Sequence, residues 1–170
     1  MTITLVANIS ANGKVLLSEN KHHEAPPAAV SSFIQVAMQA GNMVLGRSTF
    51  AFIDQLPEAA KGFLNGLEVV LLSNTLQDTA TYKVVNSPEA AIKYLQEKGF
   101  NNIAVGGGTK TYNAFLNEDL VTDIYFNIIP VITGNGGELG TNVNLEATFK
   151  LKEQQLLTDD IVQLHLTKAQ

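Results

Sequence analysis

The order of hydrophobic patterns along this chain predicts an α/β domain built on a mixed β-sheet. Short runs rich in β-branched residues alternate with segments of helical spacing, which is typical of βαβ units. The last two runs, Phe149–Leu156 and Ile161–Thr167, alternate apolar and polar residues on either side of the turn Thr158-Asp159-Asp160. This pattern indicates an antiparallel hairpin. We therefore expect one domain over residues 1–170, with a mostly parallel sheet closed by an antiparallel pair.

The first half of the chain is predicted to hold four strands and two helices. A helix begins near Pro26–Pro27, because proline suits the first helical turn, and ends near Gly41. A second, short helix begins at Ser48 or Thr49. Residues 10–26 form a long polar loop, and a loop of this length in a small domain is usually functional. The strands are Thr2–Ile9, Asn42–Gly46, Glu68–Ser73 and Tyr82–Val85, and the apolar stripe of the first helix is Val30, Phe33, Ile34, Ala37 and Met38.

The second half continues the alternation. Ser87 is the expected N-cap of a helix over Pro88–Lys98, and Gly99 ends it. A strand over Asn102–Val105 then leads through three glycines into a helix over Thr109–Leu116. A further strand over Val121–Ile129 precedes the hairpin.

Composition excludes several classes of protein. The 170 residues are 45% hydrophobic and 16% charged, which suits a buried core. The net charge of −5 argues against nucleic-acid binding, and the absence of cysteine excludes disulfides, Fe–S clusters and thiolate metal sites. With only three histidines, we expect no metal site. No uninterrupted apolar run is long enough for a membrane span, so we expect a soluble, cytoplasmic protein without membrane partners.

The segment Asn102–Leu116 carries the clearest ligand signal. A buried strand runs into Gly106-Gly107-Gly108, and a helix opens directly at Thr109. Glycines let backbone N–H groups approach a ligand closely, and a helix N-terminus favours anions. The segment predicts a phosphate or pyrophosphate site. A tight turn without a ligand is the alternative.

Two further strand ends have similar chemistry. Gly46-Arg47-Ser48-Thr49 follows one strand, and Ser73-Asn74 follows the next. An arginine can hold phosphate in a bidentate manner, and small hydroxyl and amide groups can hold a ribose. Each could equally be an ordinary cap or turn. Because ligands of α/β sheets bind at the carboxyl ends of strands, one dinucleotide could touch all three segments.

Together these residues resemble the dihydrofolate reductase superfamily. The closer branch is the reductase domain of riboflavin biosynthesis, the C-terminal domain of bifunctional deaminase-reductases. That branch carries Ser-Leu-Asp-Gly-Lys where this chain has Ser10-Ala11-Asn12-Gly13-Lys14, and the segment from Asp123 to Gly136 is also similar. The resemblance covers nearly the whole chain. It implies a three-layer fold and use of NADPH.

The resemblance also implies roles for individual residues. Arg47, Ser48 and Thr49 would contact the phosphates, and Ser73 and Asn74 the adenosine side. Gly107 and Gly108 would approach the pyrophosphate around a cis peptide. The loop over residues 10–24 would close over the nicotinamide, which Ala7 would flank. The full set of expected cofactor residues is Ala7, Gly46, Arg47, Ser48, Thr49, Ser73, Asn74, Gly106, Gly107, Gly108 and Thr109.

The chain also departs from the family pattern. True dihydrofolate reductases have an acid on the first long helix, and here Ala29 stands at that position. Dihydrofolate is therefore not the expected substrate. The zinc motif of the deaminase is absent, so we expect a stand-alone reductase-like domain. Asn12 replaces the aspartate of the riboflavin branch, which weakens that substrate assignment.

Few polar groups are left to serve the substrate and the proton transfer. His23 and Glu24 precede the first helix and could supply a proton. The polar amide of Asn127, in the middle of an apolar strand, could also act on the substrate. The expected catalytic residues are therefore His23, Glu24 and Asn127. The expected substrate residues are Asn8, Asn12 and Lys14. A solvated loop and a satisfied structural amide are the alternatives for the first set.

Three functions remain open. The first is an NADPH-dependent reductase of a small pterin- or pyrimidine-like heterocycle, acting on a C=N or carbonyl group. The second is a 5-amino-6-(5-phosphoribosylamino)uracil reductase, whose substrate phosphate would need Lys14 or Lys21. The third is a nucleotide-binding protein without turnover. The apolar strand Ile124–Ile132 and the hairpin also predict a homodimer.

Overall fold

The computed structural model describes residues 1–16, 25–79 and 81–169. Its strands form a single sheet in the order β4-β3-β2-β5-β1-β6-β8-β7. The strands are β1 (Thr2–Ser10), β2 (Asn42–Gly46), β3 (Glu68–Leu72), β4 (Lys83–Val85), β5 (Asn102–Val105), β6 (Asp123–Ile129), β7 (Phe149–Leu156) and β8 (Val162–Lys168). The helices are α1 (Pro27–Ala40), α2 (Arg47–Asp54), α3 (Glu58–Lys61), the 3-10 turn η1 (Gly62–Leu64), α4 (Pro88–Glu97) and α5 (Thr109–Asn117).

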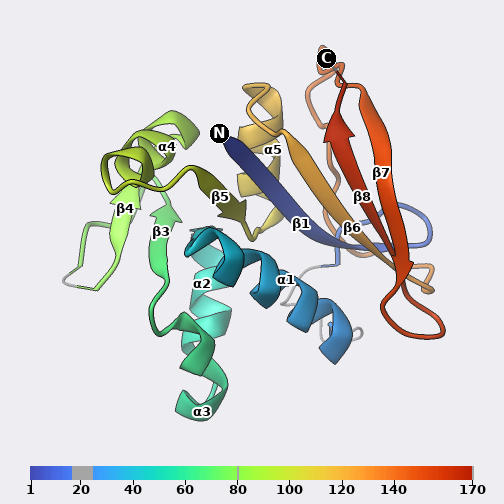
Figure 1. Cartoon of the computed structure of the whole chain (residues 1–170), viewed down its shortest axis with the longest axis horizontal. Helices are drawn as coiled ribbons and strands as arrows, with labels where there is room; N and C mark the ends of the chain where they lie inside the picture. Colours follow the sequence, from blue (N-terminus) through green and yellow to red (C-terminus); the bar gives the residue numbers. More distant parts are fainter. Residues whose placement is uncertain (17–24, 80, 170) are drawn as a thin grey trace.

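Helices cover the two faces of the sheet, which gives three layers (Figure 1). On one face, α1 and α2 pack through Ala37 and Ile53 against a cluster that includes Met43 and Leu45. On the other face, α4 and α5 bury Leu95 and Phe115 in the larger core. Strands in the middle of the sheet are buried on both sides, which explains their nearly continuous apolar sequences.

The sheet confirms the predicted fold class. The pairs of β1 with β5 and β6, and of β2 with β3, are parallel. The C-terminal strand β8 lies antiparallel to both β6 and β7. The predicted hairpin is therefore present, at the edge of a mostly parallel sheet.

β5 joins the two halves of the sheet. It enters between β2 and β1 although it follows both in the sequence. The fully buried Asn42 donates from Nδ2 to the carbonyl oxygens of Ala40 and Asn102, at 2.8 and 2.7 Å. This amide ties the start of β2 to the start of β5. Because a buried amide without partners is costly, the contact also fixes the register of the two strands.

The helix ends follow the predicted chemistry. Gly41 ends α1 in the left-handed conformation with φ of 71°, a region that favours glycine. Ser87 caps α4, its Oγ accepting from the Ala90 N–H at 3.2 Å. α3 and η1 were not predicted, because their short sequence lacks a clear period.

The predicted stripe of α1 is wrong in part. Val30 is 40% and Met38 62% exposed, whereas Ala29, Ser32 and Ala37 are buried. The buried residues of the helix are small, and Phe33 and Val36 pack beside them partly buried. A stripe chosen by hydrophobicity alone therefore misses Ser32.

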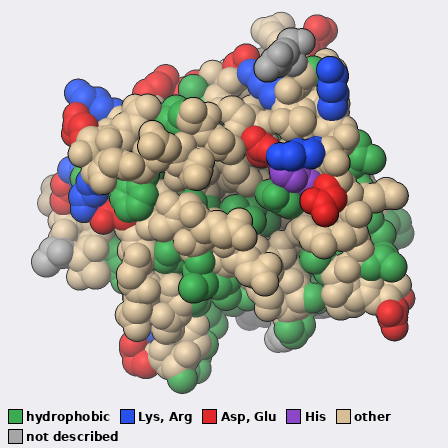
Figure 2. Space-filling model, in the orientation of Figure 1, with side chains coloured by type: hydrophobic (Ala, Val, Ile, Leu, Met, Phe, Trp, Pro, Cys, Tyr) green, Lys and Arg blue, Asp and Glu red, His purple; other side chains and the backbone are tan. Residues whose placement is uncertain are grey.

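The face drawn in Figure 2 carries basic and acidic side chains in small mixed groups, not in one basic patch. Within the part of the chain that the structure describes, no helix has the length and apolar character needed to cross a bilayer.

Candidate active site

A single cleft of about 1180 Å³ lies where β1, β2, β3 and β5 end. Its lining includes every predicted cofactor residue except Ala7: Gly46, Arg47, Ser48, Thr49, Ser73, Asn74, Gly106, Gly107, Gly108 and Thr109. The structure therefore brings together three segments that lie far apart in the sequence. This arrangement follows the rule that α/β sheets bind ligands at the carboxyl ends of their strands.

Two helix N-termini open into this cleft. α2 begins after Gly46 and α5 after Gly108, and neither end has a side-chain cap. Their first N–H groups are left for solvent or a ligand, and the helix dipole makes both ends attractive to anions. Arg47 and Lys110 add positive charge to the same lining. The cleft can therefore hold a ligand with more than one phosphate.

The glycines bring the strand ends close together. The Gly107–Gly108 peptide is cis, as the resemblance implies. The Gly107 carbonyl oxygen accepts from the Gly46 N–H at 2.6 Å, which joins the ends of β2 and β5. A Cβ at Gly46 would lie 2.5 Å from Thr111 Oγ1, and one at Gly106 would overlap the Phe33 ring. Glycine at these two positions is thus required by packing inside the protein as well as by any ligand.

Thr109 lies at the start of α5, between the cleft and the segment after β6. Its Oγ1 atom is buried and is the one buried side-chain N or O atom without a hydrogen-bond partner among the described residues. Thr109 lines the cleft at the first residue of α5. A hydroxyl buried without a partner costs free energy. Thr109 Oγ1 faces Gly137, so a ligand group in the cleft would pair with it only after the Thr109 side chain turned toward the cleft.

The end of β3 forms the far wall of the cleft. Arg47 Nη1 donates to Thr75 Oγ1 at 3.3 Å, and Ser73 Oγ accepts from the N–H groups of Thr75 and Leu76, both at 3.2 Å. These contacts hold Arg47 beside Ser73 and Asn74. Thr75, which lines the same wall, is an addition to the predicted set.

The other end of the cleft is apolar. β1 and α1 contribute Val6, Ala29, Val30 and Phe33 to it. Ala29 is fully buried, so the position of the dihydrofolate reductase acid holds only a methyl group. The prediction for Ala7 is corrected: it is 1% exposed and belongs to the core under α4 and α5. Because side chains alternate along a strand, Val6 and Asn8 face the cleft instead.

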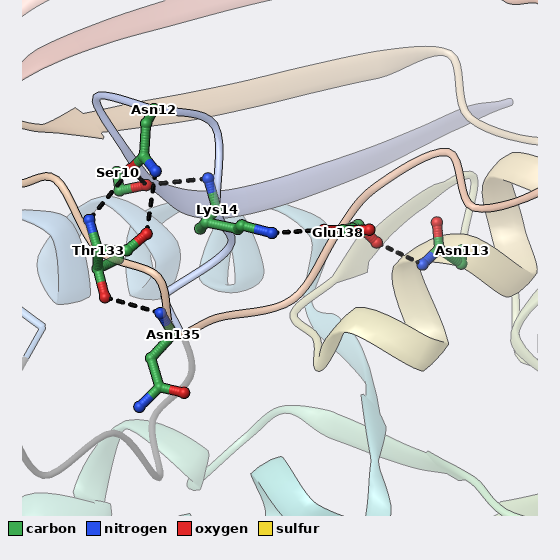
Figure 3. A network of polar contacts seen from close by, with 7 residues as sticks. All are labelled: Ser10, Asn12, Lys14, Asn113, Thr133, Asn135 and Glu138. Atoms are coloured by element: carbon green, nitrogen blue, oxygen red, sulfur yellow. Dashed lines mark hydrogen bonds and ion pairs between the residues drawn. The ribbon is translucent and has the colours of Figure 1, made fainter.

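Asn12 and Lys14, predicted to contact substrate, are not among the described residues that line the cleft, and their role toward substrate stays a prediction. Asn12 Nδ2 donates to the Thr133 carbonyl at 2.9 Å, and Lys14 Nζ forms an ion pair with Glu138 (Figure 3). The ion pair lowers the pKa of Glu138. These two contacts hold the exposed turn after β1 against residues 133–138.

The segment after β6 is also hydrogen-bonded to α5. Asn113 Nδ2 donates to the Glu138 carbonyl, and Asn113 Oδ1 accepts from the Gly140 N–H, each at 2.8 Å. Glu138 and Asn113 both line the cleft. The segment after β6 is therefore fixed as one wall of the site (Figure 3).

The predicted catalytic residues have different outcomes. His23 and Glu24 lie outside the described residues. Asn127 is fully buried and does not line the cleft, so its predicted contact with the reacting atoms is wrong. Its amide bonds to Asn8 and Gln163 instead, at 2.9 and 2.8 Å. The amide is needed inside the sheet, where a buried polar group must be paired.

Two further residues of the cleft whose pKa values are shifted, Tyr112 and Glu118, were not predicted either. Tyr112 is 5% exposed, lines the cleft and donates from its hydroxyl to the Val6 carbonyl at 2.5 Å. Burial raises the pKa of Tyr112, so the hydroxyl stays protonated. Glu118 also lines the cleft, and burial together with its hydrogen bond to Glu89 raises its pKa to about 7. Both signals depend on spatial neighbours that the sequence does not show.

The sheet order, the three layers and the cleft at the strand ends define the dihydrofolate-reductase-like fold. Residues 1–163 match the model of the RibD C-terminal domain, and the chain belongs to this family. It is a family of reductase domains of riboflavin biosynthesis, so the chain is an oxidoreductase-type domain.

Solved structures of similar fold agree. A protein from Shewanella sp. PV-4 named for riboflavin biosynthesis superposes with a TM-score of 0.78 at 20% identity, over 100% of both chains. A pyrimidine reductase-like protein from Corynebacterium diphtheriae gives 0.76 at 13% identity, over 99% of this chain and 92% of that one. RibD of Acinetobacter baumannii gives 0.74 at 17% identity; the match covers 99% of this chain but only 58% of that one.

Among curated proteins, the uncharacterized protein YwjB of Bacillus subtilis is 35% identical over 74 residues. This match covers 44% of the present chain and 41% of YwjB. The name of this relative gives no activity.

Proposed function

We propose that this chain is an NADPH-dependent reductase of a small pterin- or pyrimidine-like heterocycle other than dihydrofolate. The observation that carries the proposal is that one cleft has an end suited to anions and an apolar end. One half has two uncapped helix N-termini, Arg47 and the unpaired Thr109 hydroxyl. The other half is lined by the apolar side chains Val6, Ala29, Val30 and Phe33.

The residues present fit the cofactor. Arg47, Ser73, Asn74 and Thr75 would hold its adenosine end, and the first turns of α2 and α5 its phosphates. When bound, the nicotinamide supplies a hydride. The apolar wall of Val6, Ala29 and Phe33 would exclude water from the substrate ring. For the proton we propose His23 or Glu24, because Ala29 offers none.

Thermal unfolding with and without cofactor tests the proposal. We expect NADPH to raise the melting temperature in a concentration-dependent way, and NADH to do so less, because it lacks the phosphate that Arg47 would meet. No shift at millimolar NADPH would exclude the reductase function. Binding without oxidation of NADPH across a panel of pterins and pyrimidines would favour a nucleotide-binding protein without turnover.

The family favours a second candidate, reduction of 5-amino-6-(5-phosphoribosylamino)uracil. Its phosphate would need a cation at the substrate end, and Lys14 is already paired with Glu138. Turnover of this compound that is abolished in Lys14→Ala would support the candidate. Turnover that is unchanged in Lys14→Ala would show that Lys14 does not bind the substrate phosphate.

A further inference from the structure

Four carboxamides form a row across the neighbouring strands β1, β6, β8 and β7. Asn8 is in register with Asn127, Asn127 with Gln163, and Gln163 with Gln155. Residues in register on adjacent strands present their side chains on the same face of a sheet. We call these four residues the amide ladder.

The hydrogen bonds of the amide ladder all run in one direction. Gln155 Nε2 donates to Gln163 Oε1 at 2.7 Å, and Gln163 Nε2 donates to Asn127 Oδ1 at 2.8 Å. Asn127 Nδ2 then donates to Asn8 Oδ1 at 2.9 Å. Each amide thus donates a hydrogen bond to the oxygen of the next amide, from Gln155 at the sheet edge to Asn8 at the cleft.

The middle of the amide ladder is locked by burial. Asn127 is 0% and Gln163 4% exposed. The second N–H of Gln163 is also used, because Nε2 donates to Ser32 Oγ of α1 at 2.5 Å. Turning over one amide alone would set donor against donor or oxygen against oxygen without water to compensate, which costs free energy.

Asn8 is the end of the amide ladder and the part that a ligand can reach. Its Oδ1 is occupied by Asn127, so its NH₂ group is left to face the cleft, which Asn8 lines. Among the described residues that β1 and α1 contribute to the lining, Asn8 is the one polar side chain. A single donor in an apolar wall discriminates strongly between ligands that can and cannot accept from it.

We propose that Asn8 is a specificity-determining residue that donates a hydrogen bond to a ring carbonyl oxygen of the substrate, and that the amide ladder holds it in the donating orientation. The inference rests on the proposed reductase function and narrows its substrate class. Rings with an oxo group at this position are accepted, and rings with an amino group there are rejected because donor meets donor.

Two pteridines provide the probes; one carries oxo groups and the other amino groups at positions 2 and 4, and the protonation of the ring nitrogens N1 and N3 changes with these groups. We expect the wild-type protein with NADP⁺ to bind 2,4-dioxopteridine at least about tenfold more tightly than 2,4-diaminopteridine, measured by calorimetry. In Asn8→Asp, the carboxylate still accepts from Asn127 but presents an acceptor to the cleft. We expect this variant to reverse the preference.

A variant outside the cleft tests the amide ladder itself. In Gln163→Glu the carboxylate cannot donate to Asn127, so Asn127 and then Asn8 turn over, and the preference for the dioxo probe falls about tenfold. Gln154→Glu, which makes the same chemical change at an exposed residue of β7, should keep the wild-type preference. If Gln163→Glu does not fold, Asn8→Asp still decides the proposal.

The outcomes separate this inference from the proposed function. Equal preference in wild type and Asn8→Asp overturns the inference, as does binding of NADPH with no binding of the dioxo probe. Binding of the dioxo probe with reversal in Asn8→Asp, but without any binding of NADPH, supports the role of Asn8 and overturns the reductase.

Discussion

The side chain of Thr109 fills the space that a Cβ atom on Gly137 would occupy. The first residue of α5 and the segment after β6 therefore meet without a gap at the edge of the cleft. Gly137 also exchanges backbone hydrogen bonds with Val15, at 2.8 and 3.0 Å, so it cannot move away freely.

Gly137→Ala should therefore destabilise the protein. The added methyl group overlaps Thr109, and overpacking of this kind costs about 1–3 kcal/mol. Urea denaturation measures the loss. Gly134→Ala is the control, because an added Cβ there has nothing within 4 Å and should change stability by less than about 0.5 kcal/mol. Equal stability of the two variants would contradict the close packing.

Thr109→Val should separate folding from cofactor binding. Valine keeps the shape but removes the unpaired hydroxyl, so the free protein should be unchanged or slightly more stable. NADPH should bind about tenfold more weakly. Thr109→Ser, which keeps the hydroxyl, is the comparison. If valine and serine variants bind NADPH equally, the hydroxyl does not contact the cofactor.

Tyr112→Phe should lower stability by about 1 kcal/mol, because the Val6 carbonyl loses its donor. For a chain of this length the melting temperature should fall by roughly 2–4 °C. Since burial raises the pKa of Tyr112, the loss should be the same at pH 6 and pH 9. Tyr82→Phe is the control, since the Tyr82 ring packs against Phe50. A loss that disappears at pH 9 would show that the hydroxyl ionises.

Glu118→Gln should change the pH dependence of stability. The pKa of Glu118 is about 7 in the folded protein against an ordinary value of 4.5, so the folded state holds this proton more tightly than the unfolded chain. The stability from this group is complete below pH 4.5 and is lost as the pH rises through 7.

The glutamine variant avoids this loss. Its melting temperature should exceed that of wild type by about 1–3 °C at pH 8, since exposure weakens the effect, and should match it near pH 4.5. Glu97→Gln on α4 controls for the removal of one exposed carboxylate. A melting temperature at pH 8 below that of wild type would show that the Glu89–Glu118 contact stabilises the charged protein instead.

The outer edge of the sheet suits a second copy of the chain, and we propose a homodimer through β7. This strand ends the sheet, and its Leu151 and Leu156 are 57% and 66% exposed. We expect sedimentation at micromolar concentration to give twice the monomer mass. The double change Leu151→Lys and Leu156→Lys should give the monomer, because charge at a sheet edge opposes pairing. A monomeric wild type would exclude the dimer.

Much of the fold could be predicted from local patterns. Proline and glycine bracket α1, Ser87 caps α4, and the alternating hairpin sets the antiparallel edge. The gathering of Gly46, Ser73 and Gly107 in one cleft was also predictable, because the glycines and hydroxyls follow strands directly in the sequence. Their contact with a cofactor stays a prediction. The pairing of Gly46 with Gly107 then places those segments side by side.

The substrate half could not be predicted in the same way. The positive charge of Lys14 suits a substrate phosphate. The sequence does not show that Lys14 pairs with Glu138, because the two residues are 124 positions apart. Asn127 looks like a catalytic group in an apolar strand, and only the neighbouring strands show that Asn8 and Gln163 satisfy it. Ala7 and Asn8 are adjacent in the sequence, and the sheet sends them to opposite faces.

The position of β5 has a consequence for how the chain reaches its native state. β1 and β2 are synthesised early, but they are not neighbours in the sheet, and residues 102–105 must be added before a strand can join them. Until then β1 has no partner strand among the residues already made, and the cleft at the ends of β1, β2, β3 and β5 is incomplete. Closing the sheet requires pairing across about 100 residues of sequence, for example Ile3 with Ile103, and such long-range pairing slows folding. The cleft is therefore complete only when this long-range pairing has formed. Under the proposed function we expect NADPH to bind the completed sheet and not to act as a template for its formation.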